Sequence, residues 1–185
     1  MRTAKKTTYL AITLATSLCS ASMVELWNTK KLTTESDSVR IGEVTSKWSS
    51  WDAEKKMIYT YVKLKVNETV KGQSQEEILI KQPGGELNGV GMRVHGMAVF
   101  EQGEKALIFL KKGEGGFPSV VGMAQGKFRI VKDTNSGEDR AKFTAPEDVE
   151  FVAPEAQNYR HHLDASTVNR DVLLKKLIQE IKEVR

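Results

Sequence analysis

The feature that most constrains the fold is an alternation of side chains along residues 58–70. One parity of this run is apolar or β-branched, whereas the other is mainly polar. The first parity consists of Ile58, Thr60, Val62, Leu64, Val66 and Val70. A period of two is typical of a strand with one buried face. Because the run is about twice the usual strand length of about 5–6 residues, it favours the coiled sheet of a small barrel.

Shorter segments predict further strands. Residues 106–110 are apolar at every position, so this strand is expected to be the most buried. Gly42 interrupts an alternating run at 39–44 and marks a bend or bulge. The polar stretch 48–56 is expected to connect the first two strands. Further strands are expected at 78–80, 90–100, 120–121 and 127–131.

The C-terminal part predicts one helix. Residues 167–185 carry an apolar stripe opposite charged residues, which is typical of a helix that covers a sheet. A helix that binds a partner or a membrane surface is the alternative. The stripe consists of Val172, Leu173, Leu177, Ile181 and Val184. The fold is therefore predicted to be mainly β: one small antiparallel barrel, or a sandwich, of about six to seven strands with a C-terminal α-helix packed on it.

The N-terminus has the layout of a secretory signal peptide. A basic start precedes an apolar run at 9–19, and small residues follow it. The run is shorter than the roughly 20 residues that a membrane span requires. Cleavage is expected after Ala21, with Ser22 as the alternative, so no integral span remains. The chain is expected to be exported, to the periplasm or the extracellular space.

Two other interpretations of the N-terminus are weaker. A lipoprotein would carry its lipid on Cys19, but Leu18 stands where Gly, Ala or Ser usually precedes that cysteine. An amphipathic helix of a cytosolic protein would need a polar face, which the run does not supply.

Removal of the signal changes the composition. The whole chain has a net charge of +4, whereas the part after Ala21 has 25 Lys and Arg against 24 Asp and Glu, a net charge of +1. This balance argues against a nucleic-acid partner. Cys19 is the only cysteine, so the exported chain has no thiol for a disulfide, a nucleophile or a metal.

The sequence therefore predicts five segments. They are a signal peptide at 1–21, a lead-in segment at 22–38, a β-barrel domain at 39–132, a loop and linker at 133–165 and a C-terminal helix at 166–185.

The densest unusual stretch, at residues 82–96, supplies the candidate binding residues. It matches neither a P-loop nor the dinucleotide fingerprint. An exposed loop of this kind could bind an anion or a peptide carboxylate through backbone N–H groups and Arg93. The structural alternative is that its glycines serve tight turns and close packing. The candidate binding residues are Pro83, Gly84, Gly85, Arg93 and His95.

We predict no catalytic residue, metal ligand or cofactor. His161 and His162 are adjacent and lack a third ligand at helical spacing. Two carboxylate pairs, Asp52 with Glu54 and Glu76 with Glu77, lie on expected turns. The alternative is a small secreted hydrolase that uses His95 and Arg93 with an acid supplied by the fold.

Several aromatic residues fall on or near the first two strands: Trp48, Trp51, Tyr59 and Tyr61. An exposed cluster of this kind can bind glycans or peptides, and packing explains the same residues.

The order of several motifs resembles a family of short exported bacterial proteins of unassigned function, some of which accompany matrixin-like metalloproteases. The match covers about residues 35–131. It is carried by runs at 35–48, 58–62, 70–72, 82–85, 103–110 and 122–128. The resemblance implies a protein partner, such as a secreted metalloprotease.

The first half also resembles the OB-type barrel of tissue inhibitors of metalloproteinases. The shared features are an opening strand at 37–41, a long second strand that ends in Lys71-Gly72 and a strand that begins at Gly103-Glu104. Those inhibitors chelate zinc through an N-terminal cysteine and are stapled by disulfides, neither of which this exported chain can supply. The resemblance therefore implies an OB-like barrel and a non-enzymatic binding or accessory domain.

Overall fold

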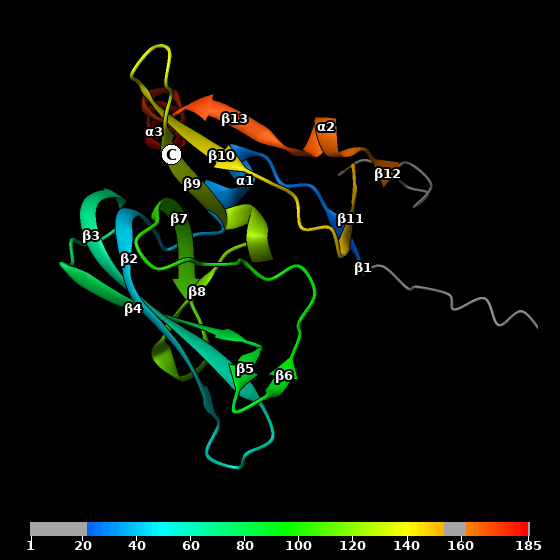
Figure 1. Cartoon of the computed structure of the whole chain (residues 1–185). Coiled ribbons are helices and arrows are strands. Elements are labelled where there is room, and N and C mark those ends of the chain that lie inside the picture. Colours follow the sequence, from blue (N-terminus) through cyan, green and yellow to red (C-terminus); the bar gives the residue numbers. More distant parts are fainter. Residues whose placement is uncertain (1–21, 154–161, 185) are drawn as a thin grey trace, which may run out of the picture.

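The structure is a computed structural model that describes residues 22–153 and 162–184 (Figure 1). The expected signal peptide, with Cys19, and the side chains of the His161-His162 pair lie outside the described residues. Within the described ranges, no helix has the length and hydropathy that a membrane span requires.

The elements follow one another in a strand-rich order. The strands are β1 (Ser22–Glu25), β2 (Ser38–Trp51), β3 (Ile58–Lys71), β4 (Glu77–Pro83), β5 (Gly85–Leu87), β6 (Val90–Met92), β7 (Lys105–Lys112), β8 (Pro118–Val120), β9 (Lys127–Lys132), β10 (Asp139–Phe143), β11 (Val149–Val152), β12 (His162–Leu163) and β13 (Arg170–Leu173). The helices are α1 (Thr29–Thr34), α2 (Ala165–Val168) and α3 (Leu174–Glu183), with single 3₁₀ turns η1 (Glu114–Gly116) and η2 (Met123–Gly126).

The main sheet is antiparallel and strongly curved (Figure 1). Its strands lie in the order β13-β10-β9-β7-β2-β3-β4, and β8 pairs with β7 as well. The predicted class, mainly β with an antiparallel sheet and a C-terminal helix, is confirmed. The main sheet contains eight strands, more than expected. The ladder does not close within the described residues, because β4 pairs only with β3.

The long pair β2 and β3 follows the alternation in the sequence. Val62 and Leu64 are fully buried, whereas Lys65, next to Leu64 on the other parity, is exposed. The register shifts beside Gly42, as the sequence predicted. A Cβ atom at Gly42 would lie 2.4 Å from the carbonyl oxygen of Lys65, so the bulge requires the close approach that only glycine permits.

The prediction that residues 48–56 connect the first two strands is wrong for residues 48–51. β2 continues to Trp51, and Trp48 lies opposite Tyr61 in the ladder. The strand persists because each of its last residues has a partner in β3, a long-range contact that local polarity does not reveal.

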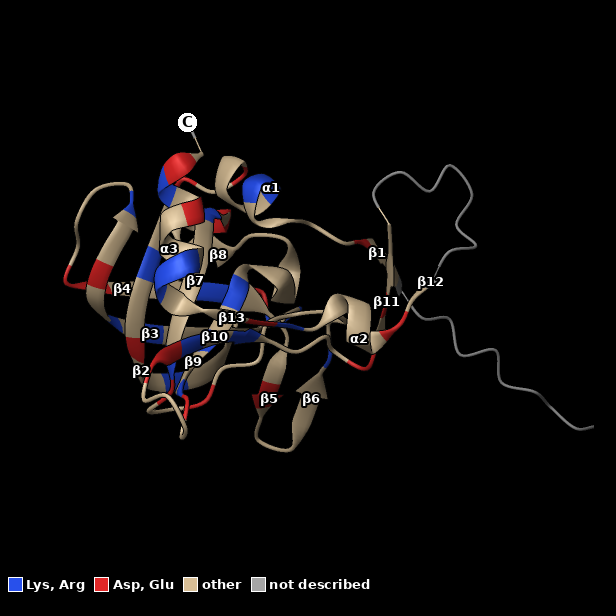
Figure 2. Cartoon of the chain, turned by 90° about the horizontal axis from the view of Figure 1, so that it is seen from above, with Lys and Arg blue, Asp and Glu red and all other residues tan. Residues whose placement is uncertain are grey.

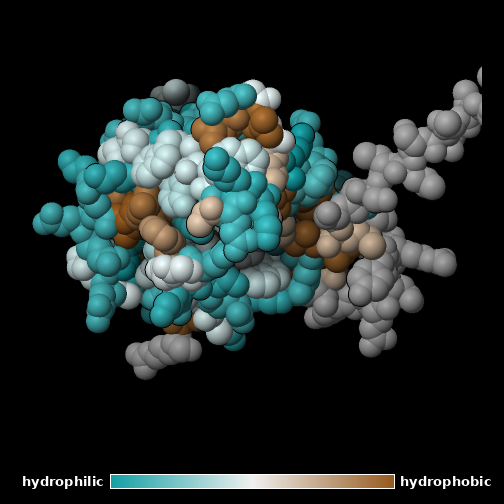
Figure 3. All heavy atoms as spheres, turned by 90° about the horizontal axis from the view of Figure 1, so that it is seen from below, coloured by the Kyte–Doolittle hydropathy of each residue, from teal (hydrophilic) through white to brown (hydrophobic). Residues whose placement is uncertain are grey.

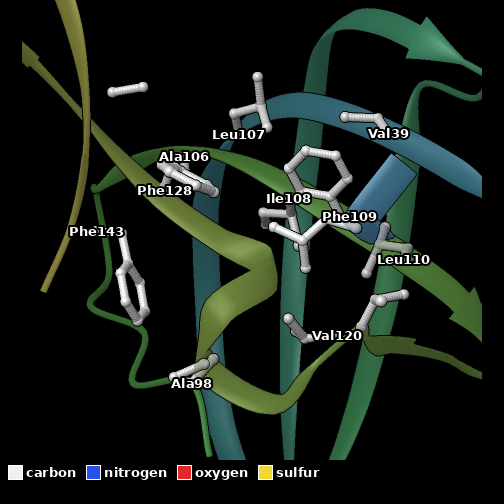
Figure 4. Packing of buried hydrophobic residues seen from close by; sticks show 14 of the residues in the cluster. Val39, Ala98, Ala106, Leu107, Ile108, Phe109, Leu110, Val120, Phe128 and Phe143 are labelled. Carbon is white, nitrogen blue, oxygen red and sulfur yellow. The ribbon is translucent and has the colours of Figure 1, made fainter. Parts of the chain in front are cut away.

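Strand β7 lies at the centre of the core. Residues 106–110 are all buried, as expected. The strand pairs with β2, β8 and β9, and its side chains pack on both faces of the sheet (Figure 4). Phe109 contacts Phe128 of β9, with ring centroids 6.1 Å apart.

The expected strand at 90–100 is interrupted. β6 ends at Met92, and a turn at His95 and Gly96 follows, with Gly96 at φ 74°. β5 and β6 form a hairpin whose two loop residues, Asn88 and Gly89, both have positive φ. This is the backbone that Asn-Gly favours in a two-residue hairpin loop.

The C-terminal predictions also need correction. The expected loop and linker at 133–165 contains β10, which pairs with β9 and β13 in the main sheet, so the sheet extends beyond the predicted limit at residue 132. It also contains β11, which pairs with β1 in parallel, and β12. The expected helix begins only at Leu174, because Arg170–Leu173 form β13 against β10. Only the later part of the stripe lies on α3, where Leu177 and Ile181 are buried. α3 lies beside α1 above the sheet (Figure 2).

We expect Gly42→Ala to lower the free energy of unfolding by about 1–3 kcal/mol, because the new methyl group meets backbone and a packed leucine. Urea denaturation measures the change. Gly91→Ala is the matched control, since a Cβ there meets nothing within 4 Å, and its effect should stay within about 0.5 kcal/mol. Equal effects of the two substitutions would contradict the packing described for the bulge.

Candidate functional site

A groove of about 660 Å³ opens beside the β5–β6 hairpin. Its walls come from β2, β3, the end of β4, the hairpin, residues 97–100 and residues 146–148. Two exposed apolar side chains line it, those of Trp48 and Val99. Val90 is also exposed, on the hairpin but outside the groove lining. Viewed from below, hydrophobic areas interrupt an otherwise mainly hydrophilic surface (Figure 3).

The structure brings the candidate binding residues to this groove. Pro83, Gly84, Gly85 and Arg93 line it. His95 is absent from the lining, but its Nδ1 atom lies 3.4 Å from Oδ2 of Asp148, which does line the groove. Residues from two distant parts of the sequence therefore meet at one rim.

The two adjacent glycines are required by close packing. A Cβ atom at Gly85 would lie 2.5 Å from Oγ of Ser49 and 2.6 Å from Oγ1 of Thr60. The Thr60 hydroxyl donates to the Gly84 carbonyl oxygen at 2.7 Å, and the Gly84 N–H donates to Ile58. Since the Gly84 N–H is used by the sheet, it is not available to an anion.

Arg93 and His95 share one carboxylate. The Nε and Nη2 atoms of Arg93 both lie 3.1 Å from Oδ2 of Asp148. The Asp148 side chain is mostly buried, whereas that of His95 is 54% exposed. The cluster fixes the 146–148 loop against the hairpin side of the groove.

Residues 97–100 are the most unusual part of the site, and the sequence did not indicate them as part of it. Lys47 Nζ donates to the Phe100 carbonyl oxygen at 2.9 Å, and Gln82 Nε2 donates to that of Ala98 at 2.7 Å. Lys127 Nζ donates to the carbonyl oxygen of Val99 between them. Three side chains from three strands thus hold three consecutive carbonyl groups.

A signal for this arrangement exists in the sequence. Gln82 has the same parity as the buried Ile78 and Ile80, so a polar group points toward the core. Lys47 lies opposite the buried Val62 in the ladder, although Lys47 itself is exposed. A polar side chain at a buried position, such as that of Gln82, needs a hydrogen-bond partner, which the backbone of another segment can provide.

Lys127 belongs to a buried ion pair. Its Nζ atom lies 2.6 Å from Oε1 of Glu104, whose side chain is only 3% exposed. Burial lowers the pKa of Lys127, and the bond to Glu104 opposes that shift. Glu104 also accepts the N–H of Glu101 at 3.0 Å. The pair holds residues 97–100 from the side that faces β9. A second hollow of about 390 Å³ lies there, lined in part by Glu104 and Lys127.

The aromatic residues pack mainly on one another. Trp48 stacks on Tyr61 at 5.6 Å, and Phe117 meets Tyr61 edge-on at 6.0 Å. Lys81 lies 3.8 Å above the ring of Tyr59. A hydrogen bond to Glu114 raises the pKa of Tyr59. These contacts agree with packing, although Trp48 keeps an exposed edge at the groove.

Within the described part of the chain, no group of three or more His, Cys, Asp and Glu side chains could hold a metal ion.

Comparison with known proteins adds no family to this geometry. No protein-family model and no curated protein matches the chain.

We expect Glu104→Gln to lower the free energy of unfolding by about 3–5 kcal/mol, because it leaves the Lys127 ammonium buried without a carboxylate. Glu101→Gln is the control, since its pair with Arg129 is exposed and 3.7 Å long, and its effect should stay within about 1 kcal/mol. Urea denaturation at neutral pH measures both. Equal losses would show that the buried pair has no special role.

The same variant should also change the pH dependence of stability. The pKa of Lys127 is lowered in the folded chain, so between that value and the unfolded value of about 10.4 the unfolded chain binds more protons. The contribution of this lysine to stability therefore rises with pH in that window. Loss of Glu104 should lower the pKa of Lys127 in the folded chain further and so widen this pH range. The difference in free energy of unfolding between the wild-type chain and Glu104→Gln should therefore become smaller as pH rises from 7 toward 10. A constant deficit would argue against a charged, buried Lys127.

Proposed function

We propose that the chain is an exported, non-enzymatic binding or accessory domain whose groove holds a protein partner. The observation that carries this proposal is the exposure of Val99, which is 72% exposed on a segment fixed from both sides. Trp48, which is 44% exposed and lines the same groove, extends the apolar surface. Exposed apolar side chains on a rigid frame are typical of protein interfaces.

Export is proposed from the signal-peptide layout. The protein would then act in the periplasm or outside the cell, without a lipid on Cys19.

For the scaffold we propose a partly open OB-like barrel made of β2, β3, β4, β8 and β7. In support, β8 pairs with β7 and also lies beside β4. The five strands would form a barrel that is closed by backbone hydrogen bonds everywhere except between β4 and β8, as in the partly open five-stranded OB-fold.

The charge distribution favours a protein partner over a nucleic acid. Basic and acidic residues are interspersed along the strands (Figure 2). Nucleic-acid binding requires a continuous basic surface. The resemblance to proteins that accompany matrixin-like metalloproteases makes a secreted metalloprotease the first partner to test. Inhibition by an N-terminal cysteine is not proposed, because Cys19 would leave with the signal.

A small hydrolase is the second candidate, and the contact between His95 and Asp148 favours it. Arg93 binds the same carboxylate oxygen, however, and His95 is half exposed at the rim. A binding role therefore accounts for the geometry with fewer additional groups. Esterase, peptidase and glycosidase assays that give turnover lost on His95→Ala would support the hydrolase instead.

The test begins with capture of the partner. The chain without residues 1–21, carrying a photo-crosslinking amino acid in place of Val99, is exposed to the secreted proteins of its own organism. The same amino acid in place of Met57, which is exposed and does not line the groove, is the control. The captured protein is identified by mass spectrometry and purified.

With the purified partner, we expect Val99→Glu and Trp48→Glu each to raise Kd by about tenfold or more, because a charge would be buried at the interface. Met57→Glu should leave Kd within about twofold. Isothermal titration calorimetry measures all three. Loss of affinity in the Met57 variant alone, or in none of them, would refute the assigned surface.

A further inference from the structure

Residues 97–100 form an extended segment without a strand partner. Within the described residues, no backbone–backbone hydrogen bond joins Met97, Ala98, Val99 or Phe100 to another segment. Ala98 and Phe100 are buried while Val99 is exposed. The carbonyl groups alternate too: those of Ala98 and Phe100 accept from side chains of β4 and β2, whereas that of Val99 accepts from a side chain of β9. Both alternations are those of an extended chain.

The groove side of this segment also contains an unsatisfied acceptor. Gln82 is 7% exposed, and its Nε2 atom is used by the Ala98 carbonyl. Its buried Oε1 atom has no hydrogen-bond partner, and Gln82 lines the groove. A buried acceptor without a donor is rare in proteins. A ligand that brings N–H groups to this wall would provide one after a small adjustment of the side chain.

The charges of the groove indicate what the ligand carries. Three carboxylates line it, from Glu86, Glu147 and Asp148, against two cations, Lys47 and Arg93. Lys47 is already engaged by the Phe100 carbonyl, and Arg93 and Asp148 are paired with each other, so Glu86 and Glu147 are the carboxylates that remain for a ligand. A ligand with a basic group therefore complements the groove.

We propose that the groove accepts an extended peptide of the partner protein, which pairs with residues 97–100 as an added strand. This inference rests on the proposed function and specifies its ligand. The peptide would supply N–H and C=O groups along the segment, as in other β-strand additions. Alternate apolar side chains would lie against Trp48, Met92 and Val99, and a Lys or Arg would meet the carboxylates.

A carbonyl oxygen has two lone pairs, so the carbonyl groups held by Gln82 and Lys47 can each accept a second bond. The side chains that fix the segment therefore do not prevent strand addition. They hold it extended in advance, which reduces the entropy lost on binding.

The test uses a phage-displayed library of random dodecapeptides. The library is selected on the chain without residues 1–21 and counter-selected on the Val99→Glu variant. Enriched sequences should alternate apolar and polar residues and contain Lys or Arg. The best peptide is synthesised, together with a series in which each backbone nitrogen in turn is methylated.

In an added strand, only every second N–H of the peptide faces the protein. We therefore expect methylation at alternate positions to raise Kd by about tenfold, and methylation at the intervening positions to change it by less than about threefold. Titration calorimetry measures the series. A methylation profile without a period of two would overturn the inference, and so would a selection that enriches no peptide.

The outcomes separate this inference from the proposed function. A partner captured at Val99 in the absence of any peptide binder would leave the function standing and refute strand addition. Failure of both capture and selection would refute both proposals.

Discussion

The backbone ladder between β7 and its three partner strands is the interaction on which the rest of the structure depends. β2, β8 and β9 all pair with β7, and residues 106–110 are buried on both faces. The described part of the chain contains no cysteine, so hydrogen bonds and packing must hold these strands together. A chain of aromatic contacts continues the core outward, from Phe109 through Phe128 and Phe143 to Phe151.

This core positions the groove. Ala98, which is labelled in Figure 4, and Phe100 are buried in it, whereas Val99 is exposed. Lys47 and Gln82 reach the segment from the β2–β3–β4 side of β7, and Lys127 reaches it from β9. The segment thus gains the rigidity of a strand from side chains, while its own backbone stays out of the sheet. A surface of this kind is stable and remains able to pair.

The sequence predicted the parts of the fold that are locally encoded. Alternating side chains predicted β3 and a continuous apolar run predicted β7, because burial alone decides those patterns. The bulge at Gly42 was also predictable. β13 was not, because Val172 and Leu173 fit a helical stripe equally well and only pairing with β10 decides their conformation. The candidate residues Pro83, Gly84, Gly85 and Arg93 do line a groove, but Asp148 and residues 97–100 join them through contacts distant in sequence.

The central claim is that residues 97–100 form a fixed strand without a strand partner. Amide hydrogen exchange of the free protein, measured by NMR, tests it most directly. The account predicts that the amides of Met97 to Phe100 exchange much faster than those of the central strand β7, whose N–H groups lie in a continuous ladder. Protection equal to that of β7 would contradict the account, because it would mean that the segment is already paired.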